Sequence, residues 1–299
     1  LLLTLFGVAR TQDGSFEPSR IAGLCLWLDG STVDGTVGDP VAGWTDRSSY
    51  GNDFASSAGH EPTVGGIGEK RSVYFSSTST SWLKANTFAG LRSGSDVTIF
   101  AVIAIDDFES DNAIIGGGYG LMPPSGWKVS LSKRYVGSGD AYEGQLQWDS
   151  FNNGEGETDR DTIRSSDNED NLVANRTLAR VVAVRKHLDK VTLYVDGVPL
   201  KEGTLDHPDV LYTSDPISVV VGAAPSTMSH FTGNIGEIVV WDKFLSNDEL
   251  ACVDFHLRTS WGVCDGCVGN NVDHAKCANY TTNVVEIIDT TLPSDPKPG

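Results

Sequence analysis

Apolar and polar residues alternate along most of this chain, and turn residues such as Gly, Asn and Asp separate the alternating runs. Successive side chains of a β-strand point to opposite faces of a sheet, so this alternation predicts half-buried strands. The predicted strands are residues 22–28, 72–76, 97–105, 112–116, 127–133, 144–149, 179–186, 190–196, 217–222 and 234–241. Many short strands between frequent turns are typical of an all-β sandwich.

Two of these runs predict more than a strand. Residues 97–105 are apolar on both faces, so we expect them to form a central strand that is covered on both sides. In residues 22–28, the three leucines at even positions are predicted to face one side, and Cys25 and Trp27 the other.

Helical spacing is convincing in one segment only, residues 246–258. Ser246 is followed three residues later by Glu249, which is the pattern of a capping box at a helix start. Apolar residues then recur at helical spacing. In contrast, residues 152–170 are polar and include seven acidic side chains, so we interpret them as a solvated loop.

Charge excludes some classes of partner. The 299-residue chain has 22 Lys and Arg against 40 Asp and Glu, a formal net charge of -18. Such a chain repels nucleic acid and anionic lipid and favours cations such as Ca²⁺. No apolar run reaches the roughly 20 residues that a membrane-spanning helix needs, so we predict no membrane insertion.

The N-terminal residues 1–9 are strongly apolar and allow two interpretations. They resemble the end of a signal peptide, with small residues at its cleavage site, although the charged start is missing. Alternatively they are a retained arm, whose large side chains must be buried, with a neighbouring subunit as the acceptor. The second interpretation predicts self-assembly.

Cysteines indicate the compartment. Three of the five lie in the last 36 residues, in a Gly- and Asn-rich segment too polar to form its own core, and such segments usually need disulfides. The five are Cys25, Cys252, Cys264, Cys267 and Cys277. One expected bridge is Cys264–Cys277, with Cys25 and Cys252 next, and an odd thiol remains. Zinc bound by Cys264, Cys267, His274 and Cys277 is the alternative.

Two glycosylation sequons, at Asn175 and Asn279, support a secreted or cell-surface setting together with the cysteines. The chain is thereby divided into an arm or signal remnant at 1–20, a sandwich at 21–262, and a tail at 263–299. The tail contains cysteines and ends in a Pro-rich linker.

Four motifs in order carry a family resemblance. They are Leu26-Trp27-Leu28-Asp29-Gly30, the turn Trp44 to Asp53, Leu193-Tyr194-Val195-Asp196-Gly197, and Phe231 to Trp241, the last followed by the helix start. The set resembles the concanavalin A-like, laminin-G-like jelly-roll family. This resemblance implies two curved antiparallel sheets, adjacent first and last strands, and recognition or adhesion more often than chemistry.

The resemblance also places the 44–53 turn near the strand that carries Glu237. Asp46, Asn52, Asp53 and Glu237 are therefore candidate ligands of a structural Ca²⁺ ion. The alternative is a buried hydrogen-bond network in which Glu237 accepts from turn amides or from Arg47.

Aromatic residues gather in the middle of the chain and could stack on sugar rings. The candidate carbohydrate-binding residues are Tyr119, Trp127, Tyr142 and Trp148. For Trp127 and Trp148, which lie in strand-like runs, the alternative is core packing.

Catalysis is not expected. A retaining glycosidase needs two carboxylates about 5–5.5 Å apart, yet Glu237 has no acidic neighbour two residues away on its strand. The preferred function is a noncatalytic extracellular module that recognises a glycan or another protein. The alternative is a structural subunit of an extracellular fibre or matrix assembled through its termini, and a glycoside hydrolase or polysaccharide lyase is the third possibility.

Overall fold

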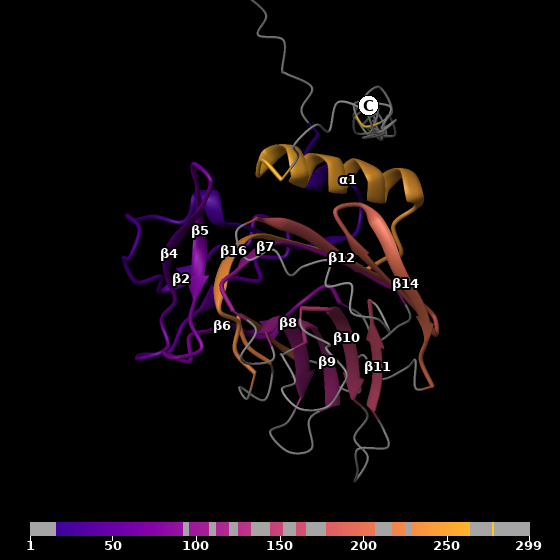
Figure 1. The fold of residues 1–299 in the computed structure, drawn as a ribbon, viewed down its shortest axis with the longest axis horizontal. Coiled ribbons are helices and arrows are strands. Elements are labelled where there is room, and N and C mark those ends of the chain that lie inside the picture. The colour runs from indigo at the N-terminus through magenta and orange to yellow at the C-terminus, as the bar shows by residue number, and fades with distance from the viewer. Residues whose placement is uncertain are drawn as a thin grey trace, which may run out of the picture.

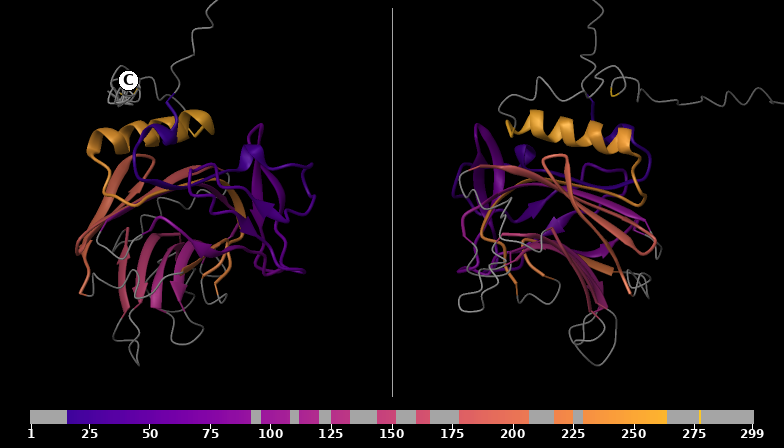
Figure 2. Two further views of the ribbon diagram at one scale, coloured as in Figure 1. Left: turned by 180° about the vertical axis from the view of Figure 1, so that it is seen from behind. Right: turned by 45° about the vertical axis from the view of Figure 1, so that its right-hand side comes forward.

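The described part of the chain forms three layers, which are two β-sheets and one α-helix (Figure 1). The computed structural model describes residues 16–91, 96–107, 112–119, 125–132, 144–151, 160–165, 178–206, 217–224, 229–263 and 277. Within these residues, helix α1 (Asn247–Ser260) lies across the outer side of one sheet, and the second sheet packs on the inner side (Figure 2). The predicted antiparallel two-sheet sandwich with one C-terminal helix is confirmed.

The sheet beneath the helix, sheet A, has its strands in the order β14-β13-β12-β7-β16-β5-β4, with β1 paired to β16. Its strands are β1 (Leu24–Asp29), β4 (Thr63–Ile67), β5 (Lys70–Phe75), β7 (Val97–Ile105), β12 (Arg180–His187), β13 (Lys190–Val195), β14 (Val198–Thr204) and β16 (Gly233–Trp241). The apolar run 97–105 is β7, a central strand between β12 and β16 as predicted.

The second sheet, sheet B, has the order β11-β10-β9-β8-β15-β6-β3-β2. Its strands are β2 (Gly43–Trp44), β3 (Phe54–Ala55), β6 (Leu83–Phe88), β8 (Asn112–Tyr119), β9 (Ser125–Leu131), β10 (Leu146–Phe151), β11 (Arg160–Arg164) and β15 (Ile217–Val221). Short 3-10 turns at Pro18–Arg20 and Gly30–Thr32 complete the described elements.

The core is divided by sheet A. Side chains on its inner face join those of sheet B in one large buried cluster, whereas its outer face forms a second cluster with α1. Phe100 and Trp241 on the outer face, with ring centroids 6.1 Å apart, belong to the cluster under the helix. A strand buried on both faces shows little alternation, which explains the continuous apolar runs of β7 and β16.

Strand β1 corrects one predicted alternation. A register irregularity between Leu24 and Leu26 breaks the period of two. As a result Cys25 lies with Leu26 in the inner cluster, and Leu24 lies with Trp27 in the outer one.

Strand β11 corrects the predicted loop at 152–170. Its sequence, Arg-Asp-Thr-Ile-Arg, has one large apolar side chain, which is too little to mark a strand. It forms because it pairs with β10 at the edge of sheet B, and Ile163 packs partly against the inner core.

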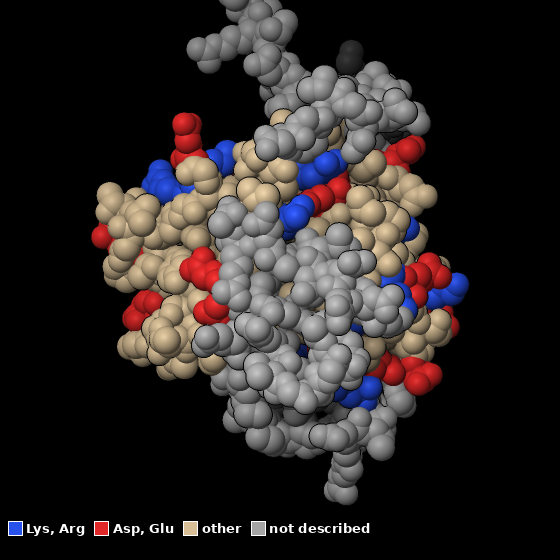
Figure 3. Space-filling model, viewed as in Figure 1, with Lys and Arg blue, Asp and Glu red and all other residues tan. Residues whose placement is uncertain are grey.

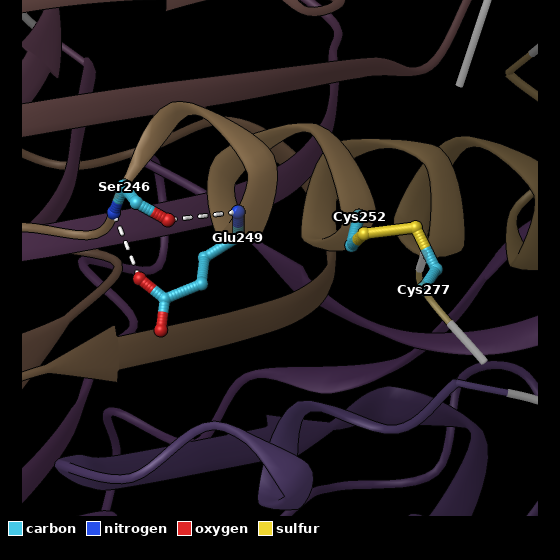
Figure 4. Close-up of a disulfide and its surroundings, with 4 residues drawn as sticks. All are labelled: Ser246, Glu249, Cys252 and Cys277. Carbon is cyan, nitrogen blue, oxygen red and sulfur yellow. Dashed lines mark hydrogen bonds between the residues drawn. A yellow bond between two sulfur atoms is a disulfide. The ribbon is translucent and has the colours of Figure 1, made fainter. Parts of the chain in front are cut away.

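Helix α1 begins with the predicted capping box. The Ser246 hydroxyl accepts from the Glu249 backbone N–H, and the Glu249 carboxylate accepts from the Ser246 N–H (Figure 4). A disulfide joins Cys252, in the middle of this helix, to Cys277 in the tail (Figure 4). The expected disulfide within 252–277 is confirmed.

The predicted pairings were nevertheless wrong. Cys277 bonds to Cys252 and not to Cys264, so it is also not available to the alternative zinc site. Cys25 is a free, buried thiol. It lies on the inner face of sheet A while Cys252 lies on the outer side, so the sheet separates the two.

Candidate functional site

The turn at 44–53 is a hydrogen-bond network centred on Asp46. Its Oδ1 accepts from the backbone N–H groups of Trp27 (2.9 Å) and Ser48 (2.8 Å), and its Oδ2 accepts from the Ser48 hydroxyl (2.6 Å) and the Asn52 N–H (2.8 Å). Asp53 accepts from the Asp46 N–H at 2.8 Å. Sequence reasoning therefore placed these three residues together correctly, and the network fastens the turn to β1.

Glu237 on β16 is buried and accepts two indole N–H groups. Trp27 Nε1 donates to its Oε1 at 2.7 Å, and Trp261 Nε1 donates to its Oε2 at 2.6 Å. These donors replace the turn amides and Arg47 that the sequence suggested. Burial raises the pKa of Glu237 to about 7, and the hydrogen bond from Trp261 opposes that rise.

The predicted calcium ligands do not converge on one cation. A Ca²⁺ ion needs six or more oxygens, but those of Asp46 already accept four hydrogen bonds and Asn52 Oδ1 accepts from the Ala89 N–H. Among the described residues, no group of three or more His, Cys, Asp and Glu is placed to hold a metal. Glu237 is linked to Asp46 through Trp27, so the four residues do not fit a Ca²⁺ shell as arranged. The calcium site stays an untested prediction.

Two of the predicted sugar-stacking residues are core residues. Trp127 on β9 and Trp148 on β10 are 1% and 0% exposed, and their rings stack with centroids 5.6 Å apart. Both side chains point between the sheets, since aromatic rings on neighbouring strands gain more from packing there than from solvent. They offer no platform to a ligand, which corrects that expectation.

The other predicted site residues lie outside the description of the structure. Tyr119 ends β8, but its side chain is not described, and Tyr142 is not described at all. The same holds for the remaining two cysteines and the two sequons, which are Cys264, Cys267, Asn175 and Asn279.

Sheet B carries a buried charge cluster on the face away from the core. Asp149 accepts from Arg160 (2.8 Å) and Thr162 (2.6 Å) and lies 3.4 Å from Lys128 Nζ. Burial alone would raise the pKa of Asp149, but the charges of Lys128 and Arg160 outweigh it and lower that pKa. The cluster therefore holds three neighbouring strands together by ion pairing.

A pocket of about 480 Å³ lies where α1 passes over the β13–β14 turn. This helix–turn pocket is lined by Arg185, Tyr194, Asp196, Gly197, Val198, Pro199, Asn247, Leu250, Ala251, Asp254 and Arg258. Asp196 and Gly197 both have positive φ, the backbone that a two-residue hairpin turn requires. The tight turn brings Gly197 against the helix, where a Cβ would lie 2.6 Å from Asp254 Oδ2.

The two carboxylates of the pocket are each paired with an arginine. Asp196 accepts from Arg180 and from the Val181 backbone N–H, which ties the turn to β12. Asp254 accepts from Arg258 Nε at 2.7 Å, four residues along the same helix. Burial raises the pKa of Asp254 to about 6, the charge of Arg258 opposes the rise, and the charge of Asp196 adds to it.

Arg185 lies at one side of the helix–turn pocket in a fixed position. Its Nη1 donates to the Leu245 carbonyl at 3.1 Å and to Asn247 Oδ1 at 2.7 Å. The guanidinium lies 4.1 Å over the Phe244 ring and 5.5 Å from the Tyr194 ring. Arginine held between rings and acceptors is a pre-organised donor.

The pocket combines apolar walls with oriented hydrogen-bonding groups. That combination is what small-molecule sites generally show. A sugar ring could pack its C–H face on Pro199 and Leu250 while its hydroxyls reach the charged groups. Sequence reasoning missed this site, although the i, i+4 pair of Asp254 and Arg258 was visible, because only the fold places the helix over the turn.

A second hollow of about 640 Å³ lies at the other end of α1. It lies between the β4–β5 hairpin and the last helical turn, and Glu69, Lys70 and Asp106 are among its lining residues. Lys70 Nζ lies 5.1 Å over the Trp261 ring, so part of this hollow belongs to the packing around Glu237.

None of the helices in the described part of the chain has the length and apolar character of a membrane-spanning helix.

Comparison with known sequences gives one match. The model of the concanavalin A-like lectin/glucanases superfamily matches residues 77–251, more than half of the chain. No curated protein matches the sequence.

Solved structures with a similar fold include toxin binding domains and a domain of an extracellular arabinanase. The binding domain of Paraclostridial Mosquitocidal Protein 1 is 13% identical with a TM-score of 0.54, over 78% of this chain and 52% of that one. Domain 4 of AbnA, an extracellular arabinanase of Geobacillus stearothermophilus solved with arabinotriose, is 14% identical with a TM-score of 0.53, over 76% and 96%.

A third similar structure comes from botulinum neurotoxin type C, whose cell entry depends on interaction with two ganglioside molecules. It is 14% identical with a TM-score of 0.54, over 79% of this chain and 51% of that one. The chain thus spans about half the length of the toxin domains it matches. At these identities the likeness shows the fold.

Proposed function

Because the chain belongs to the concanavalin A-like lectin/glucanases superfamily, we propose that it is a noncatalytic extracellular module that binds glycans in the helix–turn pocket. The observation that carries this proposal is the wall of that pocket, where Pro199 and Leu250 lie beside charged groups that partners hold in place. Sugars have both C–H faces and hydroxyl groups, so a site with both kinds of wall suits them.

The related structures support a glycan as the ligand. One was solved with arabinotriose, and another belongs to a toxin whose cell entry depends on interaction with two ganglioside molecules. Both have a fold similar to that of this chain. The disulfide between Cys252 and Cys277 supports an oxidising, extracellular setting.

Catalysis at the two pocket carboxylates is disfavoured by their surroundings. An acid catalyst must reach the glycosidic oxygen, but Asp254 is only 5% exposed and lies behind Gly197. Asp196 is hydrogen-bonded to Arg180 and to a backbone N–H. These contacts give both carboxylates a structural role.

The proposal is tested by filling the pocket. Ala251, on the helix wall, is replaced by Trp, and binding of the purified protein to a glycan array is compared with wild type. We expect glycans that bind wild type to lose at least about tenfold in affinity. Asn86→Trp, at an exposed position of β6 in sheet B, is the matched control and should bind as wild type.

Two results would overturn the proposal. The first is wild-type glycan binding that Ala251→Trp leaves intact, or no glycan binding at all. The second is release of reducing ends or unsaturated products from a bound glycan that stops in Asp254→Asn, which would make the protein an enzyme. The fibre or matrix alternative depends on chain ends that lie outside the described residues.

A further inference from the structure

We propose that the helix–turn pocket selects acidic saccharides, and that Arg185 binds their carboxylate group. This inference rests on the proposed function, since it names the class of glycan that the same pocket takes. It follows from the charge pairing, the position of the Arg185 guanidinium and the size of the pocket.

Among the charged residues of the pocket, Arg185 is the cation that has no carboxylate partner within the described residues. Asp196 is paired with Arg180 and Asp254 with Arg258, so both carboxylates are neutralised by their own arginine. Arg185 contacts only uncharged acceptors within the described residues, namely a backbone carbonyl and the Asn247 amide oxygen. In a chain of net charge -18, an arginine without a carboxylate partner at a pocket wall is a specific anion site.

The Arg185 guanidinium also has unused hydrogen-bonding capacity. Its Nε is buried and has no acceptor in the part of the chain that the structure describes. Because Nε is shielded and Nη1 already donates to two acceptors, Nη2 is the nitrogen that remains for a ligand oxygen. The rings of Phe244 and Tyr194 limit its movement, so little side-chain entropy would be lost on binding.

The pocket is too large for a bare anion. A volume of about 480 Å³ lies in the range of sites for organic ligands, and the remaining walls are Val198, Pro199, Leu250 and Ala251. These apolar side chains cannot solvate a free ion, but they can pack against a sugar ring. An acidic saccharide uses both parts of the pocket.

A carboxylate fits better than a phosphate or sulfate ester. A carboxylate oxygen accepts a short, charge-assisted hydrogen bond from a guanidinium nitrogen. A phosphate monoester carries about two negative charges, of which one arginine neutralises about half, whereas the single charge of a carboxylate matches that of Arg185. Sulfated sugars also carry one negative charge but lack the planar carboxylate group. They therefore test whether the pocket recognises the carboxylate by more than its charge.

The test compares each acidic oligosaccharide with its methyl ester, which keeps the ring and removes the charge. Galacturonate, glucuronate and sialyl oligosaccharides, their methyl esters and a sulfated galacto-oligosaccharide are titrated into the full chain by calorimetry at 150 mM NaCl. We expect at least one acid to bind at least about tenfold more tightly than its ester, and more tightly than the sulfated sugar.

Variants assign the preference to Arg185. Arg185→Gln should remove the difference between acid and ester. Arg185→Lys should keep part of it, because the positive charge remains while the planar guanidinium group is lost. Lys84→Gln removes one positive charge from sheet B and should leave the preference unchanged. The melting temperature of each variant is measured to show that it folds. If Arg185→Gln does not fold, the binding preference of Arg185→Lys tests the role of Arg185 in its place.

The outcomes separate this inference from the proposed function. Equal binding of every acid and its ester, lost in Ala251→Trp, would overturn the role of Arg185 and leave the glycan site standing. An acid preference that persists in Arg185→Gln would also overturn it. Absence of any saccharide binding would overturn the proposed function itself.

Discussion

Glu237 shows how one buried side chain can join three parts of the fold. It lies on β16 and accepts one indole N–H from β1 and another from Trp261, directly after α1. A buried carboxylate is tolerated when its oxygens are hydrogen-bonded. These two donors are neutral, so they satisfy the oxygens without supplying an opposite charge, and the pKa stays raised at about 7.

The raised pKa predicts that the domain becomes more stable as the pH falls from 8 to 6.5. A group whose folded pKa is above its unfolded value, here about 7 against 4.5, binds protons in the folded state first. Its contribution is complete below the unfolded pKa and is lost as the pH rises through 7. The expected gain is on the order of 1 kcal/mol in the free energy of unfolding, measured by urea denaturation at both pH values.

His256 opposes part of that gain, because its unfolded pKa of about 6.5 lies at the acidic end of the pH window. Burial lowers the pKa of His256 to about 4, so its contribution is present above its unfolded pKa and is lost as the pH falls from about 6.5 toward 4. Glu237→Gln should lose the gain that Glu237 contributes between pH 8 and 6.5, while the smaller contributions of Asp254 and His256 remain. It should also lose one indole hydrogen bond because an amide has one acceptor oxygen. A stability that falls on acidification from pH 8 to 6.5 would contradict the assignment.

At the scale of elements, the disulfide fixes the tail to α1. The bridge closes a loop with a sequence separation of 25, and Cys252 and Cys277 are both buried. Replacing both by Ala should lower the free energy of unfolding by about 2–4 kcal/mol, because the unfolded chain regains loop entropy. Chemical denaturation of both proteins measures the difference.

A reduced sample supplies the control for that prediction. Dithiothreitol should bring wild type close to the Cys252→Ala/Cys277→Ala variant. Cys25→Ala, which removes the free thiol in the other core cluster, should keep the effect of reduction. Equal stability of oxidised and reduced wild type would mean that the bridge does not stabilise the domain.

The long strands and the helix were predictable from sequence, and the short and edge strands were not. Strands such as β7 bury a continuous apolar run, and the capping box at Ser246 is a local signal. Two-residue strands β2 and β3 leave no period to detect, and β11 is a strand only because β10 pairs with it. A short segment of sequence shows its own periodicity, but it does not show which strand it will pair with.

For the whole molecule, the acidic composition predicts stabilisation by salt. A net charge of -18 repels itself in the compact state, and salt screens this repulsion. On the face in Figure 3, acidic and basic side chains of the described residues lie in small mixed groups. The repulsion therefore comes from the excess of acidic residues spread over the molecule and not from one acidic patch on this face. Raising NaCl from 20 to 200 mM should raise the melting temperature by about 2–4 °C.

Calcium chloride at the same ionic strength refines that measurement. Screening alone predicts equal shifts for Ca²⁺ and Mg²⁺, whereas a larger shift with Ca²⁺ would support the predicted calcium site. A melting temperature that falls with NaCl would show that attractive ion pairs, such as Arg47 with Asp29, outweigh the net repulsion.

The candidate site was the part least predictable from sequence. The helix–turn pocket combines residues of β12, β13, the turn after it and α1, which only the packing of helix on sheet brings together. Its aromatic residue, Tyr194, lies within a motif that predicted only a strand and turn. In contrast, Asp46 and Asn52 were placed together correctly because they are close in sequence.

The pairing of β1 with β16 determines how the domain would respond to a pulling force. The start of β1 lies beside the end of β16, with Leu24 opposite Trp241 and Asp29 opposite Glu237. Tension applied at residues 16 and 277 would enter through Cys252 by the disulfide and first peel α1 from sheet A. It would then unzip β1 from β16 one residue pair at a time, since both strands are loaded from the same end. The domain should therefore yield at a lower force than a sandwich whose terminal strands are sheared lengthwise.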